Sequence, residues 1–402
     1  MTTQTLRDDR QDELTWAVEG DRAGLDLTGL SPDALDRAMM RRCLALARQA
    51  WGRTAPNPLV GAVILRDRRI VGEGFHPKAG MPHAEVYALK DAGELAKGAT
   101  IYVSLEPCNH HGRTPPCSQG LVDAGVGRVI VGMVDPNPKV AGGGIKRLEN
   151  AGIPVTVGVE EAACQTLNEP FVNRIRYGRP LGILKYAMTL DGKIATTSGD
   201  SAWVTDTMAR SHVHHLRAGC DAIIVGSNTV RQDNPYLTSH SATANNPLRV
   251  VMSRQLALPK TSESGDRLHL WDTDLADTVV LTEIGANPEF QRWLTDQGVA
   301  VVELAAVTPD AAMDYLGSRG ALSVLWECGG TLAAEAIAQG AVQKVMAFIA
   351  PKIVGGMAAP MPVGDLGITT MMDALVLDRV KFEAIGSDWV FTGYLPRPSE
   401  SS

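Results

Sequence analysis

The sequence lacks several features that would place it in other classes of protein. It has no run of about 18 consecutive apolar residues, so we expect no membrane-spanning helix. Residues 1–29 are polar and charged and contain no apolar signal core, which favours a cytoplasmic over a secreted protein. The net charge of −7 at pH 7 disfavours a nucleic-acid-binding protein, because such proteins usually carry a basic face.

What is present is typical of a globular protein with two domains. A chain of 402 residues is longer than one hydrophobic core usually supports, and 45% apolar and 21% charged residues are ordinary for folded domains. The six cysteines are spread along the chain, so we expect buried thiols or metal ligands here and no disulfides. We expect a flexible extension over residues 1–30, a first domain over 31–178 and a second over 179–398.

Short apolar runs alternate with helical patterns in both halves, which predicts an α/β fold. In the first half we expect helices over 34–51, 83–89 and 118–124, and strands over 59–65, 70–74, 100–105 and 126–134. In the second half we expect helices over 207–218 and 331–339, and strands over 181–188, 222–226, 248–252, 278–281, 299–304 and 324–326. A polar turn is expected directly after residue 226, and loops over 239–246 and 259–266.

The strongest functional signal is His83-Ala84-Glu85 followed by Pro107-Cys108 and then Cys117. Zinc prefers imidazole nitrogen and thiolate sulfur, and three protein ligands leave a fourth position for a water molecule whose pKa the metal lowers. A glutamate two residues after the histidine can move protons between that water, a ring nitrogen and a leaving amine. Each residue alone could be an ordinary thiol or surface group, but the four in this order are the signature of zinc-dependent base deaminases.

The cysteine spacing departs from the usual Cys-x-x-Cys pattern. Eight residues separate Cys108 from Cys117, and they include His110, His111 and Arg113. A loop of this length still allows both sulfur atoms to reach one metal ion. Its basic side chains suit an anionic group on the substrate.

Residues 105–117 (LEPCNHHGRTPPC) resemble the zinc segment of the bifunctional deaminase–reductase family of riboflavin biosynthesis, including its longer cysteine spacing. Residues 56–61 (PNPLVG) and 75–76 (FH) are also similar to that family, and the resemblance covers about 31–396. It implies a cytidine-deaminase-like three-layer domain followed by a dihydrofolate-reductase-like domain. It also implies zinc-dependent hydrolytic deamination of 2,5-diamino-6-(5-phosphoribosylamino)pyrimidin-4(3H)-one. NADPH would then reduce the ribosyl C1′ to give 5-amino-6-(5-phosphoribitylamino)uracil.

The resemblance also implies roles for single residues of the first half. Zinc would be bound by His83, Cys108 and Cys117, and Glu85 would move protons; the pyrimidine would contact Asn57 and His76, and the ribose phosphate His110 and Arg113. From the residues alone, Asn57 could equally be a turn residue between two prolines. His110 and His111 could equally be exposed loop residues.

The second half has no Gly-x-Gly-x-x-Gly after a strand, so the standard dinucleotide fingerprint is absent. Residues 226–229 and 329–331 each follow an expected strand, where glycines and free backbone N–H groups can bind a phosphate. Each segment could equally be a plain tight turn. The segments that resemble the family's reductase domain are 190–195 (LDGKIA), 199–205 (GDSAWVT), 221–230 (DAIIVGSNTV), 233–238 (DNPYLT) and 327–332 (ECGGTL).

By this resemblance, NADPH would contact Ala187, Trp203, Thr229, Asp233, Gly329, Gly330 and Thr331, and the substrate would contact Ser201, Arg217, Leu237 and Glu327. The family often has an arginine where this chain has His240, so phosphate binding could involve His240 or rest on Arg217. Asp233 and Lys193 are both candidate acids for the reduction. The residues alone do not distinguish NADPH from NADH.

One alternative function stays open at this point. It is a single-function zinc nucleotide deaminase with a non-catalytic C-terminal binding module. Glu85 with its three zinc-ligand candidates favours an active first half, whereas the case for the second half rests on the resemblance. The substrate expected is a small phosphorylated pyrimidine, and because members of the family tend to self-associate we expect a homodimer or a tetramer.

Overall fold

The computed structural model describes residues 27–109, 115–138, 140–240, 242 and 245–396. The chain divides into two compact units, Met1–Arg176 and Tyr177–Ser402. The bounds that we expected for the two domains, 31–178 and 179–398, stay a prediction. None of the described helices is both long and apolar enough to span a membrane.

The described residues of the first unit form a layered α/β structure. Its elements in chain order are α2 (Pro32–Arg48), β1 (Gly61–Arg66), β2 (Arg69–Phe75), α3 (Ala84–Ala92), η2 (Gly93–Ala96), β3 (Thr100–Leu105), α4 (Cys117–Asp123), β4 (Arg128–Met133), α5 (Gly143–Asn150), β5 (Val155–Val157) and α6 (Glu161–Leu167). The helix α7 (Glu169–Tyr177) follows.

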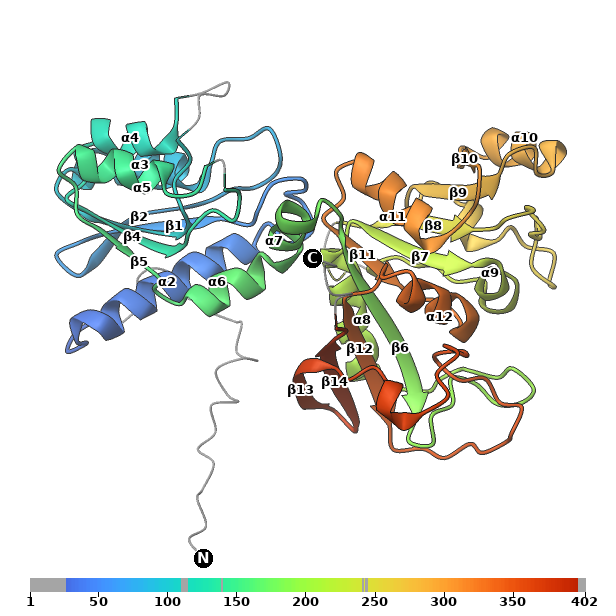
Figure 1. The fold of residues 1–402 in the computed structure, drawn as a ribbon. Helices are drawn as coiled ribbons and strands as arrows, with labels where there is room; N and C mark the ends of the chain where they lie inside the picture. Colours follow the sequence, from blue (N-terminus) through green and yellow to red (C-terminus); the bar gives the residue numbers. More distant parts are fainter. Residues whose placement is uncertain (1–26, 110–114, 139, 241, 243–244, 397–402) are drawn as a thin grey trace, which may run out of the picture. The chain divides into compact units, whose positions relative to one another are not determined.

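The sheet of this unit has the strand order β2-β1-β3-β4-β5 within the described residues. β1 pairs with β2 and β3 in antiparallel fashion, whereas β3, β4 and β5 run parallel. Helices α3, α4 and α5 lie over one face of the sheet, and α2 and α6 over the other (Figure 1). This arrangement confirms the expected three-layer fold.

Local sequence explains how the helices of this unit begin and how closely they approach the sheet. Pro32 occupies the first turn of α2, and the Ser31 hydroxyl accepts a hydrogen bond from the Ala34 N–H at 3.3 Å. A Cβ atom on Gly61 in β1 would overlap the carbonyl oxygen of Cys43 in α2. A Cβ atom on Gly74 in β2 would overlap the carbonyl oxygen of Ala84 in α3. The glycines therefore allow both helices to lie directly on the sheet.

The second unit has a larger sheet. Its elements are β6 (Leu181–Thr189), α8 (Thr207–Gly219), β7 (Ala222–Gly226), α9 (Ser227–Asp233), β8 (Leu248–Met252), η3 (His269–Trp271), β9 (Thr278–Glu283), α10 (Pro288–Asp296), β10 (Ala300–Leu304), α11 (Pro309–Ser318), β11 (Ser323–Trp326), α12 (Gly330–Ala338), β12 (Lys344–Ala350), η4 (Met371–Asp373), β13 (Asp378–Ile385) and β14 (Asp388–Tyr394). The strand order in the described residues is β10-β9-β8-β7-β11-β6-β12-β14-β13.

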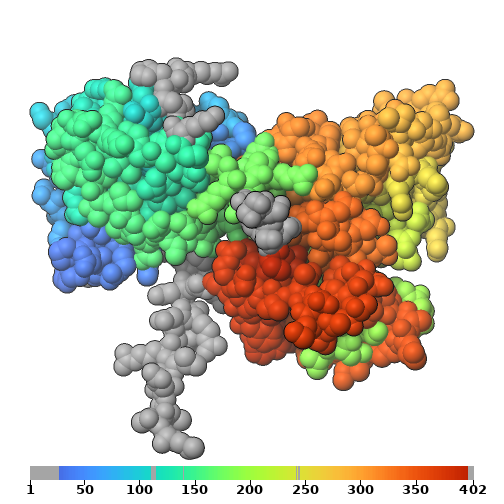
Figure 2. All heavy atoms as spheres, viewed as in Figure 1, coloured from blue at the N-terminus to red at the C-terminus, as the bar shows by residue number. Residues whose placement is uncertain are grey.

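The strands from β10 to β12 run parallel, and β14 and β13 close the sheet in antiparallel fashion. Because β7, β11 and β6 are neighbours, the segments that follow them leave the sheet at one edge, where ligands bind in open parallel sheets. Two segments far apart in the sequence, 190–205 (green) and 351–377 (red), lie side by side at this end of the unit (Figures 1 and 2). The Leu190 N–H donates to the Lys352 carbonyl at 2.9 Å, and the Gly355 N–H donates to Asp191 Oδ2 at 2.7 Å.

Several sequence expectations are confirmed with the same bounds, namely the strands over 100–105, 222–226 and 248–252. The polar turn expected after residue 226 is wrong, because helix α9 begins there with Gly226 as its N-cap. The helices α5, α10 and α11 and the strands β12, β13 and β14 were not expected.

We expect Gly61→Ala to destabilise the first unit, because the added methyl group must displace the α2 backbone from β1. Overpacking of this kind costs about 2 kcal/mol. The free energy of unfolding of the variant, measured with a denaturant, should fall by that amount. Gly120→Ala, in helix α4, is the matched control. A Cβ atom on Gly120 would have the Leu89 side chain as its nearest neighbour, at 4.0 Å, so it would overlap nothing. Equal stability of the two variants would contradict the packing argument.

Candidate active sites

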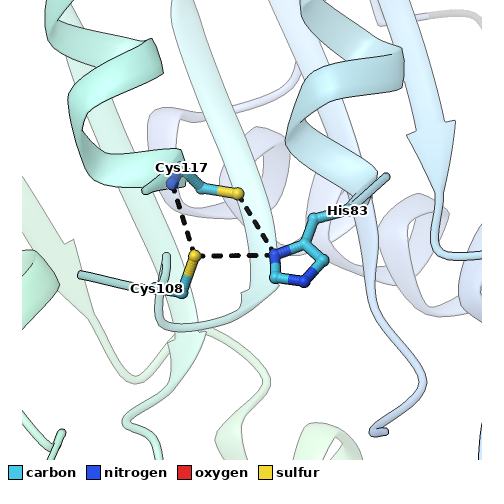
Figure 3. A group of neighbouring side chains, drawn as sticks. All are labelled: His83, Cys108 and Cys117. Atoms are coloured by element: carbon cyan, nitrogen blue, oxygen red, sulfur yellow. Dashed lines mark hydrogen bonds between the residues drawn. The ribbon is translucent and has the colours of Figure 1, made fainter. Parts of the chain in front are cut away.

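Three zinc-ligand candidates of the first unit converge on one point (Figure 3). His83 is the N-cap of α3, Cys108 follows β3, and Cys117 begins α4. His83 Nδ1 lies 3.5 Å from Cys108 Sγ and 3.3 Å from Cys117 Sγ. All three donor atoms lie within 4.8 Å of one another. The end of β3 and the starts of α3 and α4 therefore lie at one place. They bring together residues that are up to 34 positions apart in the chain.

The spacing of these atoms fits a zinc ion. With Zn–S distances of about 2.3 Å and a Zn–N distance of about 2.0–2.1 Å, tetrahedral geometry puts a nitrogen and a sulfur ligand about 3.6 Å apart. The measured separations of 3.3 and 3.5 Å agree with this value. The hydrogen bond that the Cys117 thiol donates to Cys108 lowers the pKa of Cys108 and raises the pKa of Cys117. One imidazole nitrogen and two sulfur atoms are a donor set that zinc prefers.

Glu85 lies beside this cluster with an unused oxygen. Its side chain is 3% exposed, and Oε2 has no hydrogen-bond partner among the described residues. Burial raises the pKa of Glu85 to about 7. A buried carboxyl with an unpartnered oxygen beside a three-ligand metal cluster is placed to contact a water molecule in the fourth position.

Asn57 and His76 form a hydrogen-bonded pair next to the cluster. His76 Nδ1 lies 3.0 Å from the carbonyl oxygen of Pro82, so Nδ1 must carry the proton. Burial lowers the pKa of His76, so the ring is neutral at pH 7 and Nε2 accepts a hydrogen bond from Asn57 Nδ2 at 3.1 Å. This fixes the orientation of the Asn57 amide and leaves its Oδ1 as an acceptor for a ligand. The His76 and His83 rings also meet edge to face, with centroids 5.6 Å apart.

Glu106 is a supporting residue that was not expected from the sequence. Its buried carboxylate accepts hydrogen bonds from the backbone N–H groups of Asp135, Gly142, Gly144 and Ile145 at 2.9–3.3 Å. It therefore holds the segment before α5 and the first turn of α5 next to Pro107 and Cys108. Nothing in the sequence marks this role, because the partners are backbone groups. His110, His111 and Arg113, expected at the substrate phosphate, lie outside the described residues.

In the second unit the structure joins two of the expected substrate residues in a buried ion pair. Arg217 in α8 donates from Nε to Glu327 Oε1 at 2.7 Å and from a terminal nitrogen to Oε2 at 2.9 Å. Lys185 in β6, which the sequence analysis missed, places its ammonium 3.5 Å from Glu327 Oε2. Burial opposes ionisation of Glu327, but the charges of Arg217 and Lys185 outweigh it and lower its pKa to about 2. Burial also lowers the pKa of Lys185.

The two glycine segments lie at neighbouring helix starts. Gly226 is the N-cap of α9, and Gly329 is the N-cap of α12. A Cβ atom on Gly226 would lie 3.3 Å from the Leu332 side chain, so the two starts are close. Gly329 is exposed, with open space where its Cβ would be, whereas Gly330 packs so closely that a Cβ would lie 2.6 Å from the Met361 carbonyl oxygen. The open space beside Gly329 gives a phosphate group access to the backbone at the start of α12. Such a helix start can bind a phosphate of a dinucleotide.

The other expected residues of this unit are less closely grouped. Ala187 lies in β6, Thr229 and Asp233 lie on α9, and Thr331 lies in the first turn of α12. Leu237 is buried, and the carbonyl of its neighbour Thr238 accepts a hydrogen bond from Arg217 at 3.3 Å. Ser201 and Trp203 are exposed in the segment between β6 and α8, and no described contact joins them to Arg217. The Trp203 ring faces Arg210 at 4.7 Å. The Lys193 ammonium donates to the Ala359 carbonyl at 3.3 Å.

Comparison with protein families matches both halves of the chain. Residues 180–391 match the model described as the RibD C-terminal domain, and residues 33–133 match the cytidine and deoxycytidylate deaminase zinc-binding region. The chain is 58% identical over 360 residues to the riboflavin biosynthesis protein RibD of Synechocystis sp., covering 90% of this chain and 96% of that protein. It is 40% identical over 357 residues to RibD of Aquifex aeolicus, covering 89% and 97%.

Solved structures are similar over both units. RibD of Acinetobacter baumannii is 35% identical and superposes with a TM-score of 0.79, covering 91% of this chain and all of that one. A deaminase/reductase from Thermotoga maritima is 34% identical with a TM-score of 0.77, covering 90% and 99%.

We expect Cys117→Ala to lose zinc, because two remaining protein ligands bind the metal far less tightly than three. The parent protein, purified without chelators, should carry about one zinc per chain by elemental analysis, and the variant well under half that amount. Cys164→Ala is the control, since Cys164 is equally buried in α6 but is not part of the cluster. Full zinc content in Cys117→Ala would show that the ligand set is wrong.

Proposed function

The chain belongs to the RibD family of bifunctional riboflavin-biosynthesis enzymes, and we propose that the two clusters described above carry its two activities. As a member of this family the enzyme deaminates 2,5-diamino-6-(5-phosphoribosylamino)pyrimidin-4(3H)-one and reduces the product to 5-amino-6-(5-phosphoribitylamino)uracil. Its cofactors are zinc and NADPH. The alternative of a deaminase with a non-catalytic second half is not supported, because residues 180–391 match the RibD C-terminal domain and the similarity to RibD of Synechocystis sp. covers 90% of this chain.

The observation that supports the first assignment best is the orphaned Glu85 oxygen beside three converging zinc ligands. His83, Cys108 and Cys117 would hold the zinc ion, which would supply a bound water molecule of lowered pKa. Glu85 takes one proton from the water and passes it to the ring nitrogen; the hydroxyl group added to the ring carbon later gives up its own proton through Glu85 to the departing amino group. Burial of Glu85 raises its pKa and so favours its holding the proton between the two transfers. Water provides the new carbonyl oxygen, and ammonia leaves.

Asn57 and His76 orient the pyrimidine in this proposal. The free Oδ1 of Asn57 accepts a hydrogen bond from an N–H group of the substrate. His76, neutral and fixed through Pro82, holds the amide in that orientation. The ribose phosphate would extend toward His110 and Arg113.

In the second unit, bound NADPH would supply the hydride for reduction of C1′ of the open-chain imine, and the protein would orient the two ligands and provide one proton. The starts of α9 and α12 hold the cofactor phosphates, with Ala187, Trp203, Thr229, Asp233 and residues 329–331 lining the dinucleotide. Ser201, Arg217, Leu237 and Glu327 contact the substrate. The Arg217–Glu327–Lys185 cluster fixes the Glu327 carboxylate on the substrate side of the sheet edge.

Two single substitutions should separate the activities. Glu85→Gln keeps the side-chain shape but cannot move a proton, so ammonia release should fall by at least about 100-fold. The same protein should still oxidise NADPH when it is given the deaminated intermediate. Lys185→Met should do the reverse, with NADPH oxidation lowered at least about tenfold, because Glu327 loses one of its two buried cationic partners.

Both activities are followed in the same preparations, ammonia release with the diaminopyrimidinone ribotide and NADPH oxidation with its deaminated product. Thermal unfolding of each variant checks that it is folded. A folded Glu85→Gln protein that loses both activities would show that the sites are not independent. A parent protein that releases ammonia but never oxidises NADPH would overturn the reductase assignment.

We also propose that the chain self-associates, through the hairpin of β13 and β14. β13 is the edge of the sheet in the described residues, so its outer backbone groups are open to a second strand. Phe382 and Trp389 on this hairpin are 51% and 44% exposed and stack with centroids 4.7 Å apart. Exposed aromatic pairs on an edge strand are typical of subunit contacts. A cytoplasmic location stays a prediction from the sequence.

We expect Phe382→Lys to shift the protein to a smaller species, because a charge at the contact opposes association. Light scattering after size exclusion measures the mass. Val376→Lys is the control, since Val376 is 75% exposed but precedes the hairpin. A parent protein of monomer mass would contradict self-association, and an unchanged oligomer in Phe382→Lys would exclude this hairpin as the contact.

A further inference from the structure

The two cysteine ligands are joined by a longer stretch of chain than the usual pattern has. Eight residues separate Cys108 from Cys117, whereas Cys-x-x-Cys has two. Closing a loop costs conformational entropy that increases with the length of the loop. The short spacing fixes two sulfur atoms through local backbone geometry, but the longer spacing needs further contacts to hold them at one ion. Such contacts are present among the residues that flank the loop.

Two backbone hydrogen bonds join the ends of this loop. The Cys117 N–H donates to Cys108 Sγ at 3.3 Å, as Figure 3 shows, and the Ser118 N–H donates to the Cys108 carbonyl oxygen at 3.1 Å. Both donors belong to the first turn of α4, whose N–H groups have no acceptor within the helix. These bonds restrain Cys108 itself, but not the residue that follows it.

A side-chain hydrogen bond adds a third connection, one residue further along each segment. The Ser118 hydroxyl donates to Asn109 Oδ1 at 3.0 Å. Asn109 directly follows Cys108, and Ser118 directly follows Cys117, so the bond joins equivalent positions after the two ligands. Ser118 has no exposed surface, so loss of its acceptor would leave a buried hydroxyl without a partner, which is costly.

Arg147 in α5 reinforces this connection from outside the loop. Its guanidinium donates to Asn109 Oδ1 at 3.2 Å and also to the side-chain oxygen of Gln119 in α4. One side chain therefore contacts the first residue after Cys108 and the second residue after Cys117. The rigid fork of donors on an arginine suits two separate oxygen atoms better than a single-point donor does.

Helix α5 is itself packed against the Cys108 segment, so Arg147 extends from a fixed support. A Cβ atom on Gly144 would overlap the carbonyl oxygen of Pro107. A Cβ atom on Gly143 would lie 3.6 Å from Asn109 Nδ2. Residues 143, 144 and 147 share one face of α5, because they are three or four positions apart. That face therefore holds the segment that follows β3.

We propose that Asn109, Ser118 and Arg147, which we call the loop clamp, are positioning residues that hold the two cysteine sulfur atoms at one metal ion in spite of the long loop. The proposal rests on the zinc-ligand assignment that underlies the proposed function. The loop clamp acts through the ligands. It limits the movement of Cys108 and Cys117 relative to each other and so slows the release of zinc.

The rate at which zinc leaves the protein should therefore depend on the loop clamp. Groups that orient metal ligands change metal affinity by about 10–100-fold. We expect Asn109→Ala and Ser118→Ala each to release zinc about tenfold faster than the parent. The double variant should release zinc no faster than Asn109→Ala, because the second change removes a hydrogen bond that has already been lost. Arg147→Met leaves the bond between Asn109 and Ser118 in place and should have a smaller effect.

The measurement uses the zinc-loaded full chain mixed with an excess of a chromogenic zinc chelator, whose absorbance follows the release. Thr156→Val is the matched control. The half-buried Thr156 in β5 accepts a hydrogen bond from Arg128 at 3.1 Å, so the variant loses a side-chain hydrogen bond that does not involve the metal ligands. It should release zinc at the parent rate. Thermal unfolding of each variant checks that it is folded.

Cobalt(II) bound in place of zinc reports the ligand geometry directly, because its visible absorption depends on how the sulfur and nitrogen ligands are arranged. Ser118→Ala should shift or weaken the thiolate-to-cobalt band, whereas Thr156→Val should have the parent spectrum. Asn109→Asp keeps an acceptor oxygen for the Ser118 hydroxyl. It should therefore restore slow zinc release, in contrast to Asn109→Ala.

Zinc release at the parent rate in Asn109→Ala and Ser118→Ala would overturn the proposal. Equal acceleration in Thr156→Val would do the same, because the effect would then be a general loss of stability. Multiplied effects in the double variant would show that Asn109 and Ser118 act independently, and they would also overturn the loop clamp.

These outcomes are distinct from failure of the proposed function. A parent chain that holds zinc through the loop clamp but releases no ammonia would lose the deaminase assignment and keep the proposal. A parent chain that releases ammonia, with variants that release zinc at the parent rate, would keep the function and lose the proposal. A parent chain that binds no zinc would overturn the ligand set and the loop clamp together.

Discussion

The convergence of three donor atoms on one metal position constrains the whole first unit. His83, Cys108 and Cys117 come from three separate segments, yet their donor atoms lie within 4.8 Å of one another. This requires β3 to end, and α3 and α4 to begin, at the same place. Close packing of α3 on β2 at Gly74 and the anchoring of the loop before α5 by Glu106 serve that requirement. Three protein groups converge within the described residues, and a fourth position would be left for water beside Glu85, from which the chemistry follows.

The second unit has to bind and orient two ligands. The hydride donor itself supplies the chemistry, so the protein has to hold that donor and the substrate at one edge of a parallel sheet. The starts of α9 and α12 follow neighbouring strands and offer free backbone N–H groups. The substrate side is charged instead, with Glu327 held between Arg217 and Lys185.

The sequence was informative where the signal is local. The order and spacing of His83, Glu85, Cys108 and Cys117 were sufficient to predict the metal cluster, and buried strands such as β7 and β8 are apolar runs bounded by turns. It was uninformative where contacts depend on strand order. Lys185 meets Glu327 only because β6 lies beside β11, and the stacking of His214 on His240 depends on where the segment after α9 returns. The strand β13 escaped notice because its residues are mostly exposed on both faces, so no alternation marks it.

The most direct test of the account is the coordination shell of the metal in the purified enzyme. X-ray absorption at the zinc edge counts the ligands by type. The structure predicts two sulfur atoms at about 2.3 Å, one nitrogen at about 2.0–2.1 Å and one further light atom from solvent. A shell filled by four protein ligands, or by three or more sulfur atoms, would contradict an open catalytic position. The zinc would then be structural, and Glu85 would have no part in the reaction.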